Sequence, residues 1–149
     1  MLFVLGFIFM VLFFAFIGIF SGAAAIFIDF PSAILILAAV IFFLLTTKSG
    51  KVLGGYFKSS FKKDHSYTRA ELESISAAVK NTVKFILAAG FFGFLAGLIA
   101  ALAYVGAPEK IGPNLAISLL SITYAISTGF FVFFPAQAWA ENRLNQLNS

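Results

Sequence analysis

The sequence has no cysteine and only one histidine, His65, among its 149 residues. Without cysteine the chain can form no disulfide, no thiolate nucleophile and no cysteine-ligated metal site. Charged residues are also scarce, at 11%, against about 25% in soluble domains. His65 lies in a basic stretch, where we expect it to be solvated. Because no nucleophile, base and orienting group can be assembled from these residues, we do not expect an enzyme or a resident cofactor.

Apolar side chains fill most of the chain, since 61% of the residues are hydrophobic and 21 are phenylalanine. A helix that crosses a hydrocarbon core of ~30 Å needs about 20 apolar residues. The first such segment lacks the basic start of a signal peptide and is too long for one, so we expect a retained helix. The pattern predicts an all-α integral membrane protein in a single domain, residues 1–149, with four transmembrane helices paired as two hairpins: residues 2–28, 32–47, 83–105 and 114–139.

The basic residues are concentrated between the two predicted hairpins. Seven of the ten Lys and Arg residues lie in the loop of residues 48–82, and an eighth, Lys84, lies just after it. The positive-inside rule places this loop, together with both termini, in the cytoplasm. These residues adjoin apolar spans, so we attribute them to membrane topology rather than to a nucleic-acid partner. The eight are Lys48, Lys51, Lys58, Lys62, Lys63, Arg69, Lys80 and Lys84.

The loop itself carries helical patterns. Apolar residues from Val52 to Phe61 recur at helical spacing with lysines between them, which is typical of a helix lying among lipid headgroups. Thr68 followed by Glu71 has the form of a capping box. Apolar residues then continue at helical spacing into the third span, so we expect this helix to extend several turns into the cytoplasm.

A stripe of small residues marks the third predicted span. Gly90, Gly93, Gly97 and Ala101 follow one another at steps of three, four and four, so they share one face of the helix. In lipid, such a face allows close backbone approach and tight packing. Two interpretations stay open: the stripe packs against another helix of the same chain, or it faces a pore or a partner.

Hydroxyl groups are unusually frequent in the fourth predicted span, where Ser118, Ser121, Ala125 and Thr128 form one small and polar stripe. A hydroxyl in a helix can donate to its own backbone four residues back. Positions that face lipid gain little from so many hydroxyls, so an interface or a hydrated path is the other interpretation.

Apart from Lys84 at the start of the third span, no ionisable side chain lies inside the four predicted spans, although a proton transporter usually places one at membrane depth. Ion transport by this chain would therefore need a group from another chain. Asp29 precedes Pro31 at the end of the first predicted hairpin. There its carboxylate can accept from the free N–H groups that open the second helix. We favour this capping role over a role in ion entry.

Two stretches of the sequence resemble the MotA/TolQ/ExbB family, the A-type subunits of ion-driven motors in bacterial inner membranes. Residues 90–102, GFFGFLAGLIAAL, are similar to the family's GxxGTxxGLI segment. Residues 111–135, IGPNLAISLLSITYAISTGFFVFFP, are similar to its IGPxxAxALLTTxYGxxxANxxFxP segment. With residues 17–43 and the continuation of the last stretch to residue 144, the resemblance covers about half of the chain and is closest to the flagellar stator A subunit.

The resemblance implies a homo-pentamer in membrane lipid, surrounding the single transmembrane helices of a MotB/TolR/ExbD-like B-type partner whose aspartate carries the ion. It implies that Asp29 is the family's acidic residue at the outer end of the first hairpin and that Pro135 is its proline at the cytoplasmic end of the fourth helix. Ser121 falls on the first of the family's paired threonines. The expected lining of the central cavity is Ser118, Ser121, Thr128, Gly93, Phe94 and Gly97.

Three positions depart from the family pattern. Phe94 replaces the threonine of the third helix, Ile122 replaces the second paired threonine, and Leu87 replaces a proline. These losses argue against a sodium site and leave protons or no ion. The loop is also much shorter than in flagellar stator subunits, which argues against direct drive of a flagellar rotor. The alternative hypothesis is an ion-silent oligomeric scaffold that anchors a partner helix.

Overall fold

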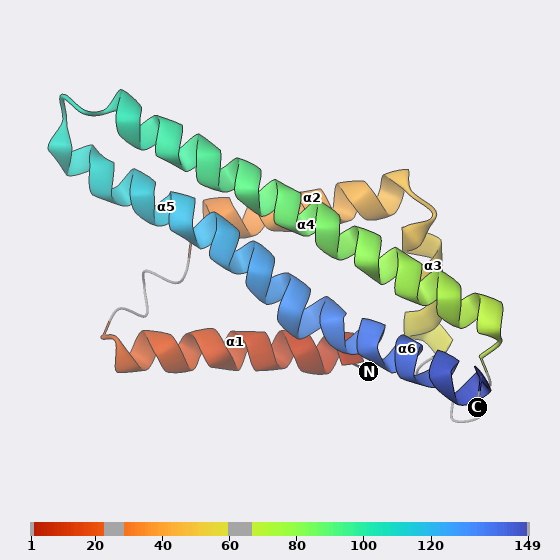
Figure 1. Cartoon of the computed structure of the whole chain (residues 1–149). Helices are drawn as coiled ribbons and strands as arrows, with labels where there is room; N and C mark the ends of the chain where they lie inside the picture. The colour runs from red at the N-terminus through yellow and green to blue at the C-terminus, as the bar shows by residue number, and fades with distance from the viewer. Residues whose placement is uncertain (1, 23–28, 60–66, 149) are drawn as a thin grey trace.

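The computed structural model describes residues 2–22, 29–59 and 67–148, and every regular element in these ranges is helical. Figure 1 shows a long hairpin of two helical rods with three further helices beside it. The elements in order are α1 (Leu2–Phe20), α2 (Phe30–Thr46), α3 (Ser49–Ser59), α4 (Arg69–Ala103), α5 (Pro108–Ser127), the π-helix η2 (Thr128–Phe133) and α6 (Phe134–Asn148).

Three helical stretches in the described residues are long and apolar enough to cross a membrane: Leu2–Phe20, Arg69–Ala103 and Pro108–Leu147. The third stretch joins α5, η2 and α6. Helices α2 and α3 are long and apolar enough only when they are counted as one segment, which is bent by 99°. Counted in this way, they make a fourth candidate span. The expected all-α class with apolar membrane helices is therefore confirmed.

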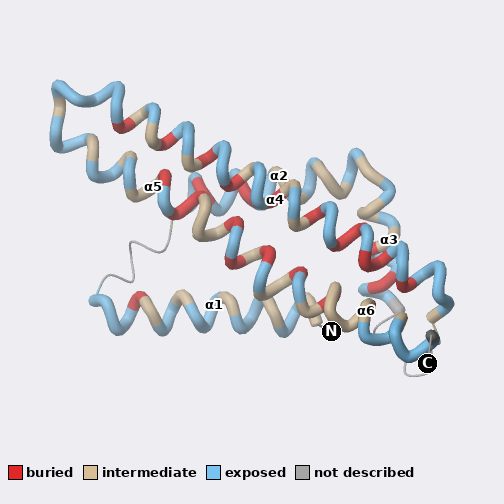
Figure 2. The backbone as a smooth tube through the Cα atoms, in the orientation of Figure 1, coloured by how far each residue is buried: buried red, intermediate tan, exposed pale blue. Residues whose placement is uncertain are grey.

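The core of the molecule lies between α4 and the α5–η2–α6 rod. In Figure 2 the buried positions follow the facing sides of these two rods. The core continues to the end of the molecule where α3 lies, because Leu72, Ile75 and Val79 of α4 are buried together with Leu53 and Tyr56 of α3. The α3 helix therefore uses part of its apolar face to pack on protein, although the sequence suggested lipid headgroups.

Helix α1 stands apart from the hairpin over much of its length (Figure 1). It packs against η2 and α6 and is mostly exposed, with only Gly18 buried. One close approach is at Gly6, where an added Cβ would lie 1.9 Å from the carbonyl oxygen of Phe131. Farther along the helix, the Phe14 ring meets Tyr124 edge-on at 5.5 Å between centroids.

Several predicted helix signals are confirmed. Thr68 and Glu71 form a complete capping box at the start of α4. The loop pattern that begins near Val52 corresponds to α3. At 1.5 Å per residue α4 is about 52 Å long, so its 35 residues exceed one span. Residues 60–66, which include His65, lie outside the described residues.

Two expected helix boundaries differ from the structure. The first helix ends at Phe20 rather than near residue 28, because Gly22 adopts a left-handed conformation with φ of 65°. The connection to α2 therefore starts earlier than residues 29–31, although residues 23–28 of it are not described. The fourth helix begins at Pro108 rather than after Pro113, because Pro108 fits the first turn, where its missing N–H needs no partner.

The helix is widened just before Pro135. The six residues of η2 have π-helical hydrogen bonds, and the N–H of Phe134 donates to the carbonyl of Gly129, five residues back. Pro135 has no N–H, and its ring would crowd the carbonyl four residues earlier in a regular α-helix. A π-turn is one of the known ways in which a helix accommodates such a conflict.

Replacing Gly6 with alanine should loosen α1 from η2, because the new methyl group meets the backbone oxygen of Phe131. Overpacking of this kind typically costs about 1 to 3 kcal/mol. The absence of native cysteine allows a direct measurement. Met10 and Thr128, whose Sδ and Oγ1 atoms lie 3.9 Å apart, can be changed to cysteine and joined with a short thiol crosslinker.

We expect Gly6→Ala to lower the crosslinking yield clearly. Gly54→Ala is the matched control, since its added Cβ would meet nothing within 4 Å. Equal yields in Gly6→Ala and the parent pair would contradict the described docking of α1.

Candidate functional site

The small residues of the third predicted span face α5 of the same chain. An added Cβ at Gly97 would lie 2.8 Å from Ser118 Cα, and one at Gly93 would lie 2.8 Å from Ser121 Cβ. At Gly90 it would lie 2.2 Å from Ala125 Cβ. The stripe therefore lets the α4 and α5 backbones approach closely inside one chain, which is the packing interpretation of the two that the sequence left open.

Ser118 and Ser121 sit in the center of this contact and donate to backbone carbonyls. The Ser118 hydroxyl donates to the carbonyl of Phe94 on α4 at 2.5 Å. The Ser121 hydroxyl donates to Ile117, four residues back, at 3.0 Å. The two serines are 1% and 2% exposed. The first bond crosses between helices, so it holds α5 on α4 as well as satisfying the serine.

A third serine, Ser32 of α2, completes the buried hydroxyl cluster. Its Oγ lies 3.0 Å from Ser121 Oγ and donates to the Ile117 carbonyl at 3.3 Å. Ser32, which opens the second predicted span, was not among the candidate residues predicted from the sequence. Its place three residues after a capping aspartate was the available signal, because that register puts it at the start of a helix.

Asp29 caps α2, as we expected. Its Oδ2 accepts from the N–H of Ser32 at 3.0 Å, and Pro31 lies in the first turn of the helix. The backbone N–H of Asp29 donates to the Tyr124 hydroxyl of α5 at 3.2 Å. The cap and the hydroxyl cluster therefore share Ser32, and together they tie the start of α2 to α5.

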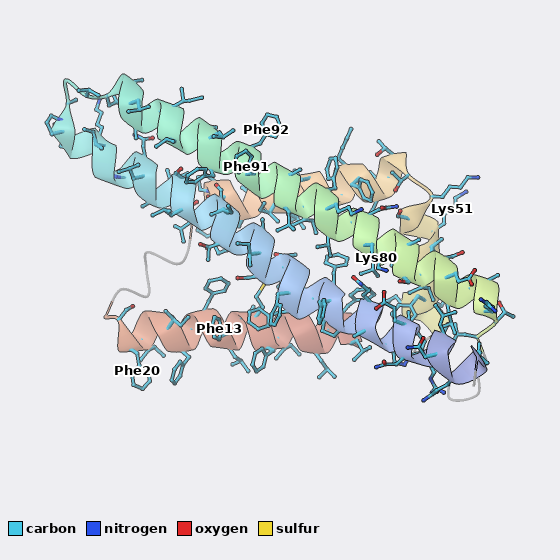
Figure 3. All side chains as sticks on the ribbon, viewed as in Figure 1. Phe13, Phe20, Lys51, Lys80, Phe91 and Phe92 are labelled. Atoms are coloured by element: carbon cyan, nitrogen blue, oxygen red, sulfur yellow. The ribbon has the colours of Figure 1, made fainter. Side chains whose placement is uncertain are left out.

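The other candidate residues lie elsewhere or contribute backbone atoms. Phe94 joins the cluster through its carbonyl, while its side chain is only partly buried and stacks near Phe91. Figure 3 shows Phe92 on the side of α4 that is turned away from α5. Thr128 lies on η2, where its hydroxyl faces Met10 of α1. Pro135 lies at the start of α6, just after the widened turn, and is not part of the cluster.

The long hairpin carries no charged side chain over most of its length. None lies between Lys84 and the end of α4, and none lies between Lys110 and Glu141 on the other rod. Within the described ranges, no group of three His, Cys, Asp or Glu side chains could hold a metal ion. At this depth the chain offers hydroxyls and carbonyls, which form hydrogen bonds but do not carry a charge.

The sequence matches no protein-family model and no curated protein. The geometry itself therefore carries the interpretation of the site. It is a hydroxyl cluster that joins three helices at membrane depth, with an aspartate cap beside it.

Replacing Gly97 with alanine should destabilise the chain, since the new methyl group would meet backbone atoms of Ser118 that cannot move alone. We expect a loss of about 1 to 3 kcal/mol, typical of overpacking. The measurement is unfolding in mixed detergent micelles, followed by circular dichroism.

Gly112→Ala is the control, because an added Cβ there meets nothing within 4 Å. A helical Gly→Ala change in the open gains up to about 1 kcal/mol. If Gly97→Ala and Gly112→Ala unfold at the same midpoint, the tight contact between α4 and α5 does not stabilise the chain.

Proposed function

We propose that this chain is the A-type subunit of a proton-driven motor complex of the MotA/TolQ/ExbB type in a bacterial inner membrane. Five copies surround the transmembrane helices of a B-type partner, and inward proton flow through the complex is converted into rotation or force. The proposal starts from the resemblance in residues 17–43, 90–102 and 111–135. The single structural observation that carries it is a long apolar hairpin with buried hydroxyls and no charge at membrane depth.

The missing charge explains why a partner is required. A proton transporter usually places an ionisable group in the hydrocarbon layer, and because such a group is costly there, it is reserved for function. This hairpin supplies hydroxyls only, and the B-type partner supplies the carboxylate. Each proton that crosses 100 mV can deliver about 2.3 kcal/mol.

The length of α4 supports the transmission of force. Its apolar part, after Lys84, is long enough for the membrane, and its first four turns lie beyond that part against α3 and α6. Lys80 of α4 pairs with Glu141 of α6 at 2.8 Å in this outer region. Movement of the membrane part would therefore be carried by one continuous helix into a packed region outside it.

The positive-inside rule places this packed region and both termini in the cytoplasm. In Figure 1 the start of α1 and the end of α6 lie toward the end of the molecule that holds α3. Figure 3 shows Lys51 and Lys80 toward that same end, with Phe20 at the opposite end.

An ion-silent scaffold is the second candidate, and one observation favours it. The hydroxyls of Ser118 and Ser121 already donate to carbonyls and are nearly inaccessible. In this alternative, the cluster only holds α2, α4 and α5 together. The oligomer then grips a partner helix without passing ions.

The assembly can be tested by purifying the chain in mild detergent with its accompanying proteins and measuring the native mass. We expect five copies of this chain and a partner with one transmembrane helix that carries an aspartate. A partner helix without any acid would support the scaffold instead. A monomer with no companion would refute both.

The ion path can be tested by replacing Ser121 with alanine in the reconstituted complex and measuring proton flux into vesicles. If the hydroxyl assists the partner's carboxylate, flux should fall about tenfold or more, because a hydrogen bond to a charged group contributes about 1.5 to 3 kcal/mol.

Thr123→Ala is the control for this test. Thr123 also donates to a carbonyl four residues back, that of Leu119, but it lies outside the cluster. Unchanged flux in Ser121→Ala, alongside lowered stability, would assign the serine a structural role only.

A further inference from the structure

An open groove of about 470 Å³ lies where α2 ends and the chain bends into α3. Its far wall is the middle of α4. The bend of 99° marks the point at which the apolar α2 stops and the basic α3 begins. The groove therefore lies at the boundary between the hydrocarbon layer and the headgroups. It is lined by Phe43, Thr47, Ser49, Asn81, Lys84 and Phe85.

The groove is polar at one end and apolar at the other. On α2, Phe43 lies one turn deeper than Thr47, and on α4, Phe85 lies one turn deeper than Asn81. The rings of Phe43 and Phe85 stack at 4.8 Å between centroids and form the apolar end, where Ala88 also lines the groove. Both walls thus change from polar to apolar in the same direction, which matches a lipid molecule with its headgroup outward.

The charge at the polar end is positive. Lys84 is exposed, and among the described residues it makes no ion pair. Among the described residues, no acidic side chain lines the groove. Lys48 directly precedes the lining residue Ser49 in the chain and is also exposed, without an ion pair in the described ranges. A phosphate would find cations there without competition from a protein carboxylate.

We propose that this groove binds one anionic phospholipid. The lipid phosphate lies at Lys84 and the Ser49 hydroxyl, and one acyl chain follows Phe85 toward Ala88 at the deep end. A lysine near an anionic lipid surface contributes about 1 kcal/mol. A single acyl chain adds contact with the apolar wall. This inference requires only that the chain sits in a membrane, so it is independent of the proposed motor.

The experiment reconstitutes the full chain in vesicles of equal phosphatidylglycerol and phosphatidylcholine, extracts it in mild detergent, and identifies the retained lipid by native mass spectrometry. We expect one phosphatidylglycerol per chain, in preference to phosphatidylcholine. Lys84→Gln should lower that preference about fivefold. Lys58→Gln is the matched control, since Lys58 is an exposed lysine of α3 that does not line the groove.

A second variant tests the apolar end of the groove by filling it with a larger side chain. Ala88→Leu should lower lipid retention, because the added carbons occupy the place of the acyl chain, whereas Ala96→Leu, an exposed alanine of α4 outside the groove, should not. Equal effects of Lys84→Gln and Lys58→Gln would reveal diffuse attraction and overturn the site. Unchanged lipid retention in Ala88→Leu, or displacement of the lipid by millimolar glycerol phosphate alone, would also overturn the proposed site.

Discussion

The close approach of α4 and α5 is the contact on which the other elements depend. Within a bilayer, lipid tails are as apolar as leucine, so helices gain nothing by hiding apolar surface from lipid and associate through tight packing and hydrogen bonds. Gly93 and Gly97 allow that packing, and Ser118 adds a bond to the opposite backbone. Ser32 then attaches α2 to the same place. By contrast, α1 has one glycine contact and stays largely exposed.

Much of this fold could be predicted because its signals are local. An aspartate or threonine before an apolar run satisfies free N–H groups wherever the helix goes, and the caps at Asp29 and Thr68 are found as expected. Helical spacing likewise identified α3 and the extension of α4. These features need no knowledge of neighbouring helices, because the atoms involved lie within one turn of the chain.

The partners of the helical faces could not be predicted in the same way. The stripe of Gly93 and Gly97 is equally suited to a helix of the same chain and to a partner, and only the three-dimensional structure shows Ser118 and Ser121 opposite it. Ser32 was missed for this reason, since its role depends on Ile117 far along the chain. The predicted start of α5 was wrong because the sequence has two nearby prolines, Pro108 and Pro113, and either of them suits the first turn of a helix.

The π-turn before Pro135 also sets the angular phase of everything that follows it. The buried residues on this rod include a line at 118, 121, 125, 129, 133, 136 and 140, with three successive steps of four that lead into η2. In a plain α-helix each step of four drifts by about 40° around the axis, so the buried line would wind away from α4. The wider turn offsets that drift. The single chain can therefore keep one face toward α4 from the hydroxyl cluster to Glu141, whereas the same residues wound as a plain α-helix would turn the last helix by about 100°, the rotation of one residue.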